Sequence, residues 1–416
     1  MNSKDQINTM PALQFQMKLI KLFKSLIRGR RNPAGYWKKG GAIVFNQIPI
    51  PSLISDKWVI VKTVYCGICG SDMKEITLNG ARDNPIQSFV SFPHTIGHEI
   101  VGIIDQVGSA VKKVNIGDRV VINPWFSCEP RGISPKCSRC QKGDFNHCRN
   151  FQRGQLPTGM HLGITKGFGG YAPYVAVHES QCFVIPDGIT FDKAILADPF
   201  AVTFHSCLLL NPKPDNLILV YGLGVLGLAT VMCLKNIFKI KHVIAVGRYE
   251  FQKEQALQSG ADHVFMGSAA DLIRDIASTL NLELIKPKGG LIWAIDGVDG
   301  IIDTIGSVET FEVGIRVLTT KGRLIFTGVS TPHRCENTPH YFKELEIIGS
   351  CGAVVEDFQG KRSNAFQFFL EFLDKKLFDP SPLLTHKFLL EDYKNAFNTL
   401  VTKRDSQAIK VVFDFT

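Results

Sequence analysis

The chain has 416 residues, of which 45% are hydrophobic and 20% are charged. This is the composition of an ordinary globular protein long enough for two domains, and it excludes a disordered or fibrous protein. The net charge of +9 comes mostly from one basic segment near the N-terminus, so we expect no general nucleic-acid-binding surface.

The first predicted elements are a short strand at residues 10–16 and a basic helix at residues 18–28 (KLIKLFKSLIR). The apolar side chains of this helix form one stripe with lysines opposite: Leu19, Leu22, Phe23, Leu26 and Ile27. The ordinary interpretation is a surface helix that packs its stripe on the body of the protein. The alternative is a cationic amphipathic helix at about 18–31 that contacts an anionic membrane surface or a protein partner.

Two regions with different sequence patterns follow along the chain. Between residues 41 and 199, short β runs alternate with Gly, Pro and Asn, which predicts a mostly β region. From about residue 216, apolar runs alternate with helical stretches, as a doubly wound parallel sheet requires. We expect strands at 58–65, 100–107, 119–122, 172–177, 217–220, 242–246, 300–303 and 323–326, a helix at 366–375 and a closing strand at 409–415.

The cysteines are clustered in a way that indicates metal binding by reduced thiols. A disulfide scaffold would need a different distribution of the 11 cysteines, and the chain shows no secretion signal, so we expect a cytoplasmic protein. Cys66 and Cys69 stand three apart in CGICGSD. Their spacing alone fits half a zinc knuckle, a redox-active pair or a turn that presents one metal ligand.

A dense group of thiols lies further on, in CSRCQKGDFNHC. Cys137, Cys140 and Cys148 are close enough in sequence to share one tetrahedral ion. The fourth ligand would be Cys128 or His147, and we favour Cys128.

A second set of candidate ligands is dispersed along the chain. His98 and Glu99 stand in PHTIGHE, and Asp198 stands in LADP. Together with a cysteine, imidazole and carboxylate are a ligand set that suits Zn²⁺.

The segment LILVYGLGVLG at residues 217–227 predicts a nucleotide site. The run 217–234 is long enough to suggest a membrane span, but its glycine spacing argues against that interpretation. Gly222 permits a tight turn, Gly224 lets the backbone approach a pyrophosphate, and Gly227 allows close contact between helix and strand. Between these glycines the loop holds Leu223, Val225 and Leu226.

The end of the second predicted Rossmann strand indicates which coenzyme is preferred. Gly247 and Arg248 stand where an NAD-selective site usually has a carboxylate for the ribose hydroxyl. Glycine leaves room for a 2′-phosphate, and a guanidinium can pair with it. We therefore predict NADP(H) in preference to NAD(H).

Together these motifs resemble the zinc-containing medium-chain alcohol dehydrogenase family over roughly residues 10–416. The markers are GICGSD, GHE, the cysteine group, DPFAVTFH at 198–205 and the glycine loop. The resemblance implies an α/β fold with a GroES-like, mostly β catalytic domain at 1–199, which includes a zinc lobe at 128–148. A doubly wound Rossmann domain would follow at 200–345, and residues 346–416 would complete the catalytic domain.

The resemblance also implies roles for individual residues. Cys69 and His98 would hold a catalytic zinc, with Glu99 and Asp198 as direct ligands or ligands through water. Asp72 would orient the histidine, Ser71 would begin a proton relay, and Cys66 would pack nearby. The departures from the family pattern are Asp198 in place of Glu, Ser134 in place of the first lobe cysteine, Lys74 in place of a relay histidine, and the basic insertion.

The activity implied is zinc-assisted hydride transfer between an alcohol, polyol or sugar, or the matching carbonyl, and a nicotinamide cofactor. A homodimer or homotetramer is expected from the family and from general frequency. Two alternatives remain at this point. One is a zinc-independent quinone or enone reductase of the same fold, and the other is a catalytically idle nucleotide-binding protein associated with a membrane or a partner.

Overall fold

The computed structural model of the chain describes residues 8–81, 83–328 and 334–416. Residues 1–7, which the predicted first domain includes, lie outside the described residues. Contacts divide the chain into two compact units. The first comprises Met1–Asp198, Val354–Asp374 and Asp379–Thr416, and the second comprises Pro199–Ala353 and Lys375–Phe378. The first unit is therefore assembled from both ends of the chain.

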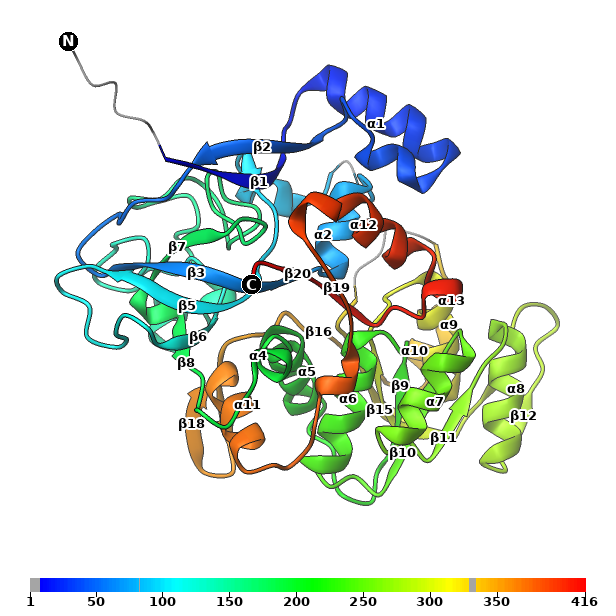
Figure 1. The fold of residues 1–416 in the computed structure, drawn as a ribbon. Coiled ribbons are helices and arrows are strands. Elements are labelled where there is room, and N and C mark those ends of the chain that lie inside the picture. The colour runs from blue at the N-terminus through cyan, green and yellow to red at the C-terminus, as the bar shows by residue number, and fades with distance from the viewer. Residues whose placement is uncertain (1–7, 82, 329–333) are drawn as a thin grey trace, which may run out of the picture. The chain divides into compact units, whose positions relative to one another are not determined.

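The first unit is built on two main sheets, with β17 and β18 as a separate antiparallel pair (Figure 1). The larger has the strand order β19-β20-β3-β5-β6-β8, with β7 paired to β3, and the smaller has the order β2-β1-β4. Strand β20 joins β3 along one edge and β19 along the other. The strands are β1 (Thr9–Phe15), β2 (Ile43–Pro49), β3 (Trp58–Gly67), β4 (His94–Thr95), β5 (Glu99–Val107), β6 (Arg119–Ile122), β7 (Tyr174–His178), β8 (Cys182–Val184), β17 (Val355–Phe358), β18 (Lys361–Asn364), β19 (Leu384–Phe388) and β20 (Lys410–Asp414).

The central strand β3 explains where this unit has its core. All its residues except Lys62 are buried, as a strand covered on both faces requires. The helices of the unit are short: α1 (Leu19–Arg31), η1 (Pro33–Trp37), α2 (Gly70–Ile76), η2 (Pro85–Phe89), α3 (Ser138–Gln141), η3 (Phe145–His147), η4 (Glu179–Gln181), α4 (Phe191–Ala194), α11 (Ala365–Asp374), η5 (Ser381–Leu383), η6 (Leu390–Asp392), α12 (Tyr393–Val401) and α13 (Lys403–Ser406).

The second unit is a parallel sheet with the order β11-β10-β9-β14-β15-β16. The order reverses direction at β9, which is where such sheets bind ligands at the carboxyl ends of their strands. Its elements are α5 (Ala197–Leu210), β9 (Leu217–Tyr221), α6 (Val225–Asn236), β10 (His242–Val246), α7 (Glu250–Gln258), β11 (His263–Phe265), α8 (Ala269–Thr279), β12 (Leu284–Ile285), β13 (Trp293–Ala294), β14 (Val298–Asp303), α9 (Val308–Val317), β15 (Leu318–Phe326), α10 (Thr338–Phe342) and β16 (Glu346–Gly349).

Two stretches that the expected boundaries give to the catalytic domain fall in the second unit, residues 346–353 and Lys375–Phe378. Strand β16 pairs with β15 in the parallel sheet, so the second unit continues beyond residue 345 to Ala353. The residues 217–234 form a strand and a helix of the same sheet. Among the described residues, the helices include none with both the length and the apolar character needed to cross a membrane.

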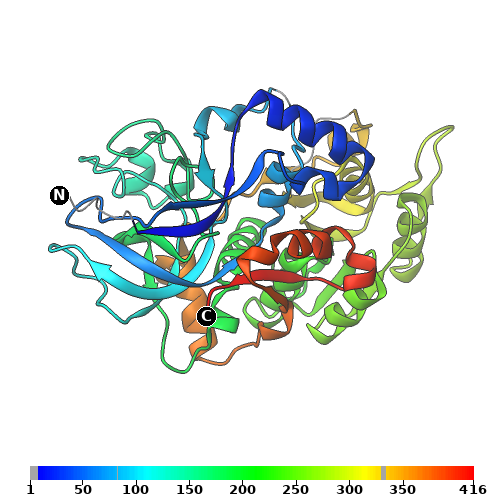
Figure 2. The ribbon, with the colours of Figure 1, turned by 45° about the horizontal axis from the view of Figure 1, so that its top comes forward.

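Helix α1 forms where the sequence predicts it, but its apolar stripe packs on the body only in part: Leu22 contacts the core of the first unit. Leu19 and Phe23 are 85% and 66% exposed. The helix instead buries Ser25 and Gly29. A side chain at Gly29 would lie 2.4 Å from the ring of Tyr36, so two short residues and Leu22 form the docking face, while Leu19, Phe23 and Ile27 remain outside. Figure 2 shows the helix beyond the end of the hairpin formed by β1 and β2.

Candidate active site

The first candidate ligand lies where β3 ends and α2 begins. Cys69 is the N-cap residue of α2, and its backbone N–H donates to Oδ2 of Asp72 over 2.9 Å. Asp72 thereby closes the first turn of the helix, since a carboxylate at this position accepts an otherwise unpaired amide. The Cys69 thiol is partly accessible, whereas Cys66 is fully buried at the end of the strand.

Asp72 also faces His98, which immediately precedes β5. Oδ1 of Asp72 lies 3.1 Å from Nδ1 of His98, which leaves Nε2 of the ring to bind a metal. The hydroxyl of Tyr171 donates to the other oxygen of Asp72 over 2.8 Å. Burial opposes the charge on Asp72, but His98 and these hydrogen bonds outweigh it and lower the pKa of the carboxyl.

The backbone before His98 requires glycine. Gly97 has a φ of +92°, and a Cβ there would lie 2.3 Å from the ring of Tyr171. The glycine of GHE thus lets the loop turn beneath the tyrosine and present His98 beside Asp72.

Glu99 lies at the start of β5 and is buried. Its Oε2 pairs with Nζ of Lys410, the first residue of β20. Nζ of Lys410 also donates to the carbonyl of Ile68 over 3.2 Å. Burial alone would lower the pKa of Lys410, but the charges of Glu99 and Cys69 raise it, so the lysine is a cation at neutral pH.

The structure brings Cys69, His98 and Glu99 together, with one donor atom of each lying within 4.8 Å of the others. A thiolate, an imidazole and a carboxylate at this separation fit Zn²⁺, and three protein ligands leave a position open for a substrate or water. Asp198 is not part of this group among the described residues. It is buried near the start of α5, where burial and then the charge of Glu99 raise its pKa to about 7.

The remaining predicted residues of this site lie on α2. Ser71 is exposed and Lys74 is half-buried. Burial lowers the pKa of Lys74, although the charge of Cys69 opposes that shift.

A further histidine, which sequence reasoning missed, lies against His98. The ring centroid of His161 is 5.3 Å from that of His98 and 5.3 Å from that of Trp125. Nδ1 of His161 contacts the carbonyl of Leu162, which fixes it as the donor and Nε2 as the acceptor. Burial and then the charge of His98 lower the pKa of His161 to about 3, so the ring is neutral at pH 7.

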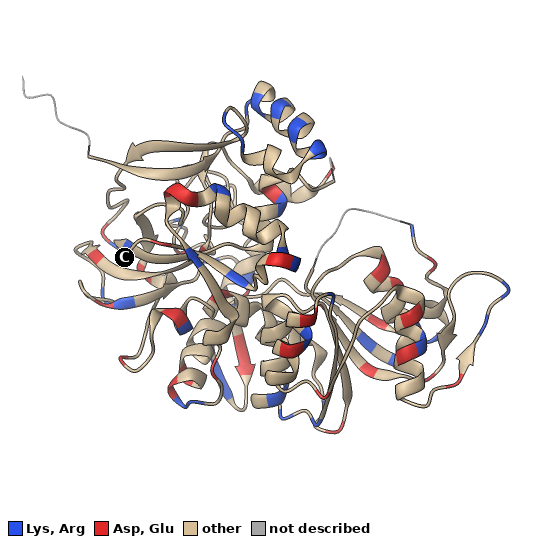
Figure 3. Cartoon of the chain, turned by 45° about the vertical axis from the view of Figure 1, so that its right-hand side comes forward, with Lys and Arg blue, Asp and Glu red and all other residues tan. Residues whose placement is uncertain are grey.

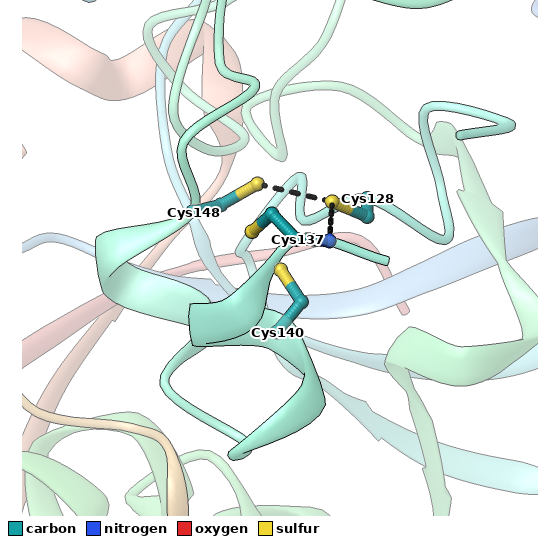
Figure 4. Close-up of side chains that lie close together, drawn as sticks. All are labelled: Cys128, Cys137, Cys140 and Cys148. Atoms are coloured by element: carbon teal, nitrogen blue, oxygen red, sulfur yellow. Dashed lines mark hydrogen bonds between the residues drawn. The ribbon is translucent and has the colours of Figure 1, made fainter. Parts of the chain in front are cut away.

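The four thiols of the cysteine lobe also converge (Figure 4). One Sγ from each of Cys128, Cys137, Cys140 and Cys148 lies within 4.8 Å of the others, a set that fits a closed tetrahedral zinc site. Sγ of Cys128 lies 3.6 Å from that of Cys148. His147 is outside this group, and Ser134 is exposed.

Backbone amides point at the thiols of the lobe. The backbone N–H of Cys137 lies 3.3 Å from Sγ of Cys128, and that of Asn150 lies 3.4 Å from Sγ of Cys148. Burial opposes ionisation of Cys137, but the amides of Arg149 and Cys140 lower its pKa to about 6. Cys137 is therefore ready to bind zinc, whereas burial raises the pKa of Cys128, and the Cys148 thiol and burial raise that of Cys140. Zinc binding must displace the protons of these two thiols.

Arg131, which lies in the segment 129–136 between Cys128 and Cys137, organises the loop around the lobe. It is fully buried, and its guanidinium donates to five backbone carbonyls, those of Phe126, Arg153, Leu156, Pro157 and Gly159. Burial lowers the pKa of Arg131 to about 10, so it keeps its charge at neutral pH.

The glycine loop of the second unit has the geometry of a phosphate cradle. Gly222 has a φ of +94°, and a Cβ at Gly227 would lie 1.7 Å from the carbonyl oxygen of Gly222. By contrast, a Cβ at Gly224 would meet no atom within 4 Å. Gly224 is the N-cap of α6, so the open space lies at the amide-rich end of a helix, which binds anions.

The intervening Leu223 packs toward the end of β10. Its Cδ1 would lie 2.9 Å from a Cβ at Gly247. Arg248, which follows Gly247, is exposed, and its guanidinium carbon lies 5.6 Å from the centroid of the Tyr249 ring. Val225 and Leu226 begin α6.

Three residues of the first site were not found from the sequence: Tyr171, His161 and Lys410. Each is distant along the chain from the site residue that it contacts. Only Lys410 had a local signal, because it is a charged residue in the otherwise apolar run AIKVVF and lies fully buried.

Comparison with known proteins finds matches over most of the chain. Residues 55–187 match the profile described as alcohol dehydrogenase GroES-like domain, and residues 225–368 match that described as zinc-binding dehydrogenase. L-idonate 5-dehydrogenase of Vitis vinifera is 30% identical over 364 residues, which are 86% of this chain and 88% of that protein. (R,R)-butanediol dehydrogenase of Saccharomyces cerevisiae is 29% identical over 89% of this chain and 95% of its own length.

A solved structure shares the fold. The chain resembles an Escherichia coli alcohol dehydrogenase solved with NADH, with a TM-score of 0.74, 24% identity, and coverage of 98% of this chain and 99% of that one.

Proposed function

This chain belongs to the zinc-containing medium-chain alcohol dehydrogenase family, and from that membership we propose that its substrate is a vicinal diol, a polyol or a sugar, with NADP(H) as the preferred coenzyme. The chain is a zinc-dependent, NAD(P)-linked oxidoreductase that transfers a hydride between an alcohol and a nicotinamide. The comparisons support neither of the two alternatives, the zinc-independent reductase or the idle nucleotide-binding protein.

The observation that carries the proposal is the convergence of Cys69, His98 and Glu99. A redox-active pair would need Cys66 and Cys69 both accessible, but Cys66 is buried, and burial raises the pKa of its thiol well above the usual value. Cys69 instead shares its site with an imidazole and a carboxylate. A thiolate, an imidazole and a carboxylate together can bind zinc, whereas thiol exchange does not need this combination.

The chain's own residues have separate tasks in this proposal. Cys69, His98 and Glu99 would hold the zinc, which when bound supplies a Lewis acid that makes an alcohol oxygen easier to ionise. Asp72 fixes the ring of His98 and keeps its Nδ1 occupied. Ser71, which is exposed beside Cys69, accepts the alcohol proton and passes it to solvent, because no histidine continues the relay at Lys74.

The proposal of a diol or polyol substrate rests on two points. The names of the relatives specify butanediol and idonate, which carry hydroxyl groups on neighbouring carbons. The neutral His161 beside His98 offers an acceptor nitrogen, to which a second hydroxyl of the substrate can donate.

The preference for NADP(H) rests on the end of β10. There the chain has Gly247 and Arg248 and no carboxylate to repel a 2′-phosphate. The exposed guanidinium is free of any described ion pair and can form paired hydrogen bonds with a phosphate.

The test begins with metal analysis of the purified chain, for which we expect two zinc ions. A screen of diols, polyols, sugars and simple alcohols with both coenzymes follows. Turnover of vicinal diols at least about tenfold better than simple alcohols supports the substrate class. Equal Kd values for NADPH and NADH, or an unchanged preference in Arg248→Ala, would contradict the coenzyme preference.

A homodimer or homotetramer, a cytoplasmic location and a membrane or partner contact through residues 18–31 stay predictions. Light scattering of the purified chain measures the first. The contact through the basic helix would use a surface that includes none of the zinc ligands.

A further inference from the structure

Helix α1 presents an exposed apolar ridge, defined here as Leu19, Ile20, Phe23 and Ile27. These side chains are 85%, 71%, 66% and 44% exposed. Leu19, Phe23 and Ile27 follow one another at intervals of four residues, so they form a row along the helix, with Ile20 beside it. Single exposed apolar residues are ordinary on a protein surface, but a continuous row of large ones indicates a contact.

The ridge is held in a fixed orientation by the opposite side of the helix. Oγ of Ser25 accepts a hydrogen bond from the backbone N–H of Ala42 over 3.0 Å. A Cβ at Gly35 would lie 2.3 Å from the backbone of Arg28, so α1 and η1 are in direct backbone contact. Trp37 at the end of η1 is buried and packs edge-on against Phe397 at 5.5 Å. The helix is therefore part of the folded body, and rotating the ridge inward would break this packing.

A basic row, defined here as Lys24, Arg28 and Arg31, lies beside the ridge. These residues also follow one another at intervals of three or four, on the side of the ridge away from the docking face. Lys38 and Lys39 extend the positive charge into the next loop, and both are exposed. Figure 3 shows Lys and Arg positions, in blue, spaced along the helix. No Asp or Glu occurs between Asp5 and Asp56, so the segment carries no carboxylate of its own.

We propose that α1 is a peripheral membrane anchor that lies flat on a bilayer containing anionic phospholipid. The ridge enters the boundary between headgroups and acyl chains, while the basic row stays at the level of the phosphates. The side chains of Lys24 and Arg31 are long enough to keep their charges in water while their stems follow the apolar surface. The dehydrogenase unit is thereby positioned at a membrane surface, which goes beyond the catalytic function proposed above.

Charge favours a lipid surface over a second copy of the chain. A two-fold contact between α1 helices would bring Lys24 and Arg28 of both copies into one interface, with no carboxylate on the segment to offset them. An anionic bilayer supplies a dense layer of negative charge and an apolar layer directly beneath it. The ridge and the basic row match these two layers in that order.

The test uses the purified, zinc-loaded full chain and sedimentation with vesicles. One set of vesicles is phosphatidylcholine alone, and the other contains roughly one third phosphatidylserine. We expect the parent chain to bind the anionic vesicles at least about tenfold more strongly than the neutral ones, with binding weakened by high salt.

Two pairs of variants separate the ridge from the basic row. Ile20→Gln with Phe23→Gln should weaken binding to anionic vesicles at least about tenfold, at low salt as well as high. Its matched control is Leu389→Gln, because Leu389 is 61% exposed elsewhere on the same unit, and it should change nothing. Lys24→Gln with Arg31→Gln should remove the preference for anionic lipid, whereas Lys321→Gln, whose side chain is 74% exposed, should retain it.

Dehydrogenase turnover and the unfolding midpoint of each variant should equal those of the parent chain, since none of these residues contacts the zinc ligands. A parent chain that stays in the supernatant with anionic vesicles at low salt overturns the proposal. So does equal binding by Ile20→Gln/Phe23→Gln. A parent dimer that the same double variant converts to monomers, without vesicle binding, would assign the ridge to a second copy instead.

Discussion

Lys410 forms an ion pair with Glu99 in the interior of the first unit, and both side chains are buried. The pair joins the last strand of the chain to the start of β5. Glu99 is also one of the three donors grouped with Cys69 and His98. The Glu99 carboxylate therefore contacts the buried Lys410 ammonium and also belongs to the group that would hold a zinc ion.

Replacing Lys410 by Met should destabilise the metal-free chain by about 3–5 kcal/mol, because it leaves Glu99 buried without a counter-charge. Zinc should restore part of this loss, because the ion is a new partner for Glu99. Urea unfolding with and without zinc measures both effects. The matched control is Lys387→Met, which breaks a half-exposed pair with Asp192 at 2.7 Å and should cost no more than about 1 kcal/mol. Equal losses in the two variants would contradict the prediction.

Cys69→Ser should abolish turnover and reduce the zinc content from two ions to one per chain, with the fold retained. Serine is a favourable N-cap residue, so α2 should still begin at Gly70. Cys66→Ala is the matched control. Its thiol is buried three residues earlier, and its loss should leave both zinc ions and most of the activity. Metal analysis and steady-state kinetics decide the outcome, and full activity in Cys69→Ser would exclude the zinc assignment.

Asp198 should make the metal-free chain less stable as the pH rises. Burial raises its pKa from an ordinary value near 3.8 to about 7, so the folded chain binds the proton more tightly than the unfolded chain. The stability that this proton contributes is fully present below about pH 4 and is lost as the pH rises toward 7, at up to roughly 1.4 kcal/mol per pH unit.

Asp198→Asn removes this titration. The difference in unfolding free energy between parent and variant, measured after chelation, should change steadily between pH 4 and 7. A constant difference would contradict the prediction. Asp192→Asn is the control, because this carboxylate is half exposed.

Cys128→Ser should lose the lobe zinc while the other zinc remains. The thiol lies 3.6 Å from Sγ of Cys148, and serine is a poor substitute for a thiolate ligand. Adding Ser134→Cys, which restores the family pattern, should not recover the ion, because Ser134 is exposed outside the thiol group. Zinc analysis of the single and double variants checks this. Recovery in the double variant would show that the lobe can close on the usual position.

Local motifs allowed most of the two metal groups to be predicted from the sequence. Cys69, His98 and Glu99 each stand in a short pattern whose chemistry can be recognised without knowing the fold. Lys410 could not be predicted as the partner of Glu99, because the contact joins residues 311 positions apart in the chain. A strand register of that kind depends on tertiary packing, so the sequence around either residue says almost nothing about its partner.

Helix α1 shows a different limit. The period of its apolar residues predicts the helix, but a period does not say which side meets the body. Ser25 and Gly29 decide that, because only short side chains allow Tyr36 and the backbone of η1 to come so close. In the sequence these two residues look like interruptions of the pattern, although they form its docking surface.

The glycine loop was predicted in most detail. The roles of Gly222, Gly224 and Gly227 follow from where a side chain could not fit, and the structure has crowding at the first and third positions and open space at the second. Such a loop is a local device, so its sequence contains nearly all the information that its shape requires.

The buried Arg131 has a consequence for how the cysteine lobe matures. A guanidinium that gathers carbonyls on both sides of the thiols can shape the pocket before any ion arrives. Zinc would then bind to a site whose loop is already ordered. Removing the ion would leave the four thiols close together, whereas a lobe without the buried arginine would unfold. The segment 129–136, which separates Cys128 from Cys137, thus contains the arginine that orders this loop.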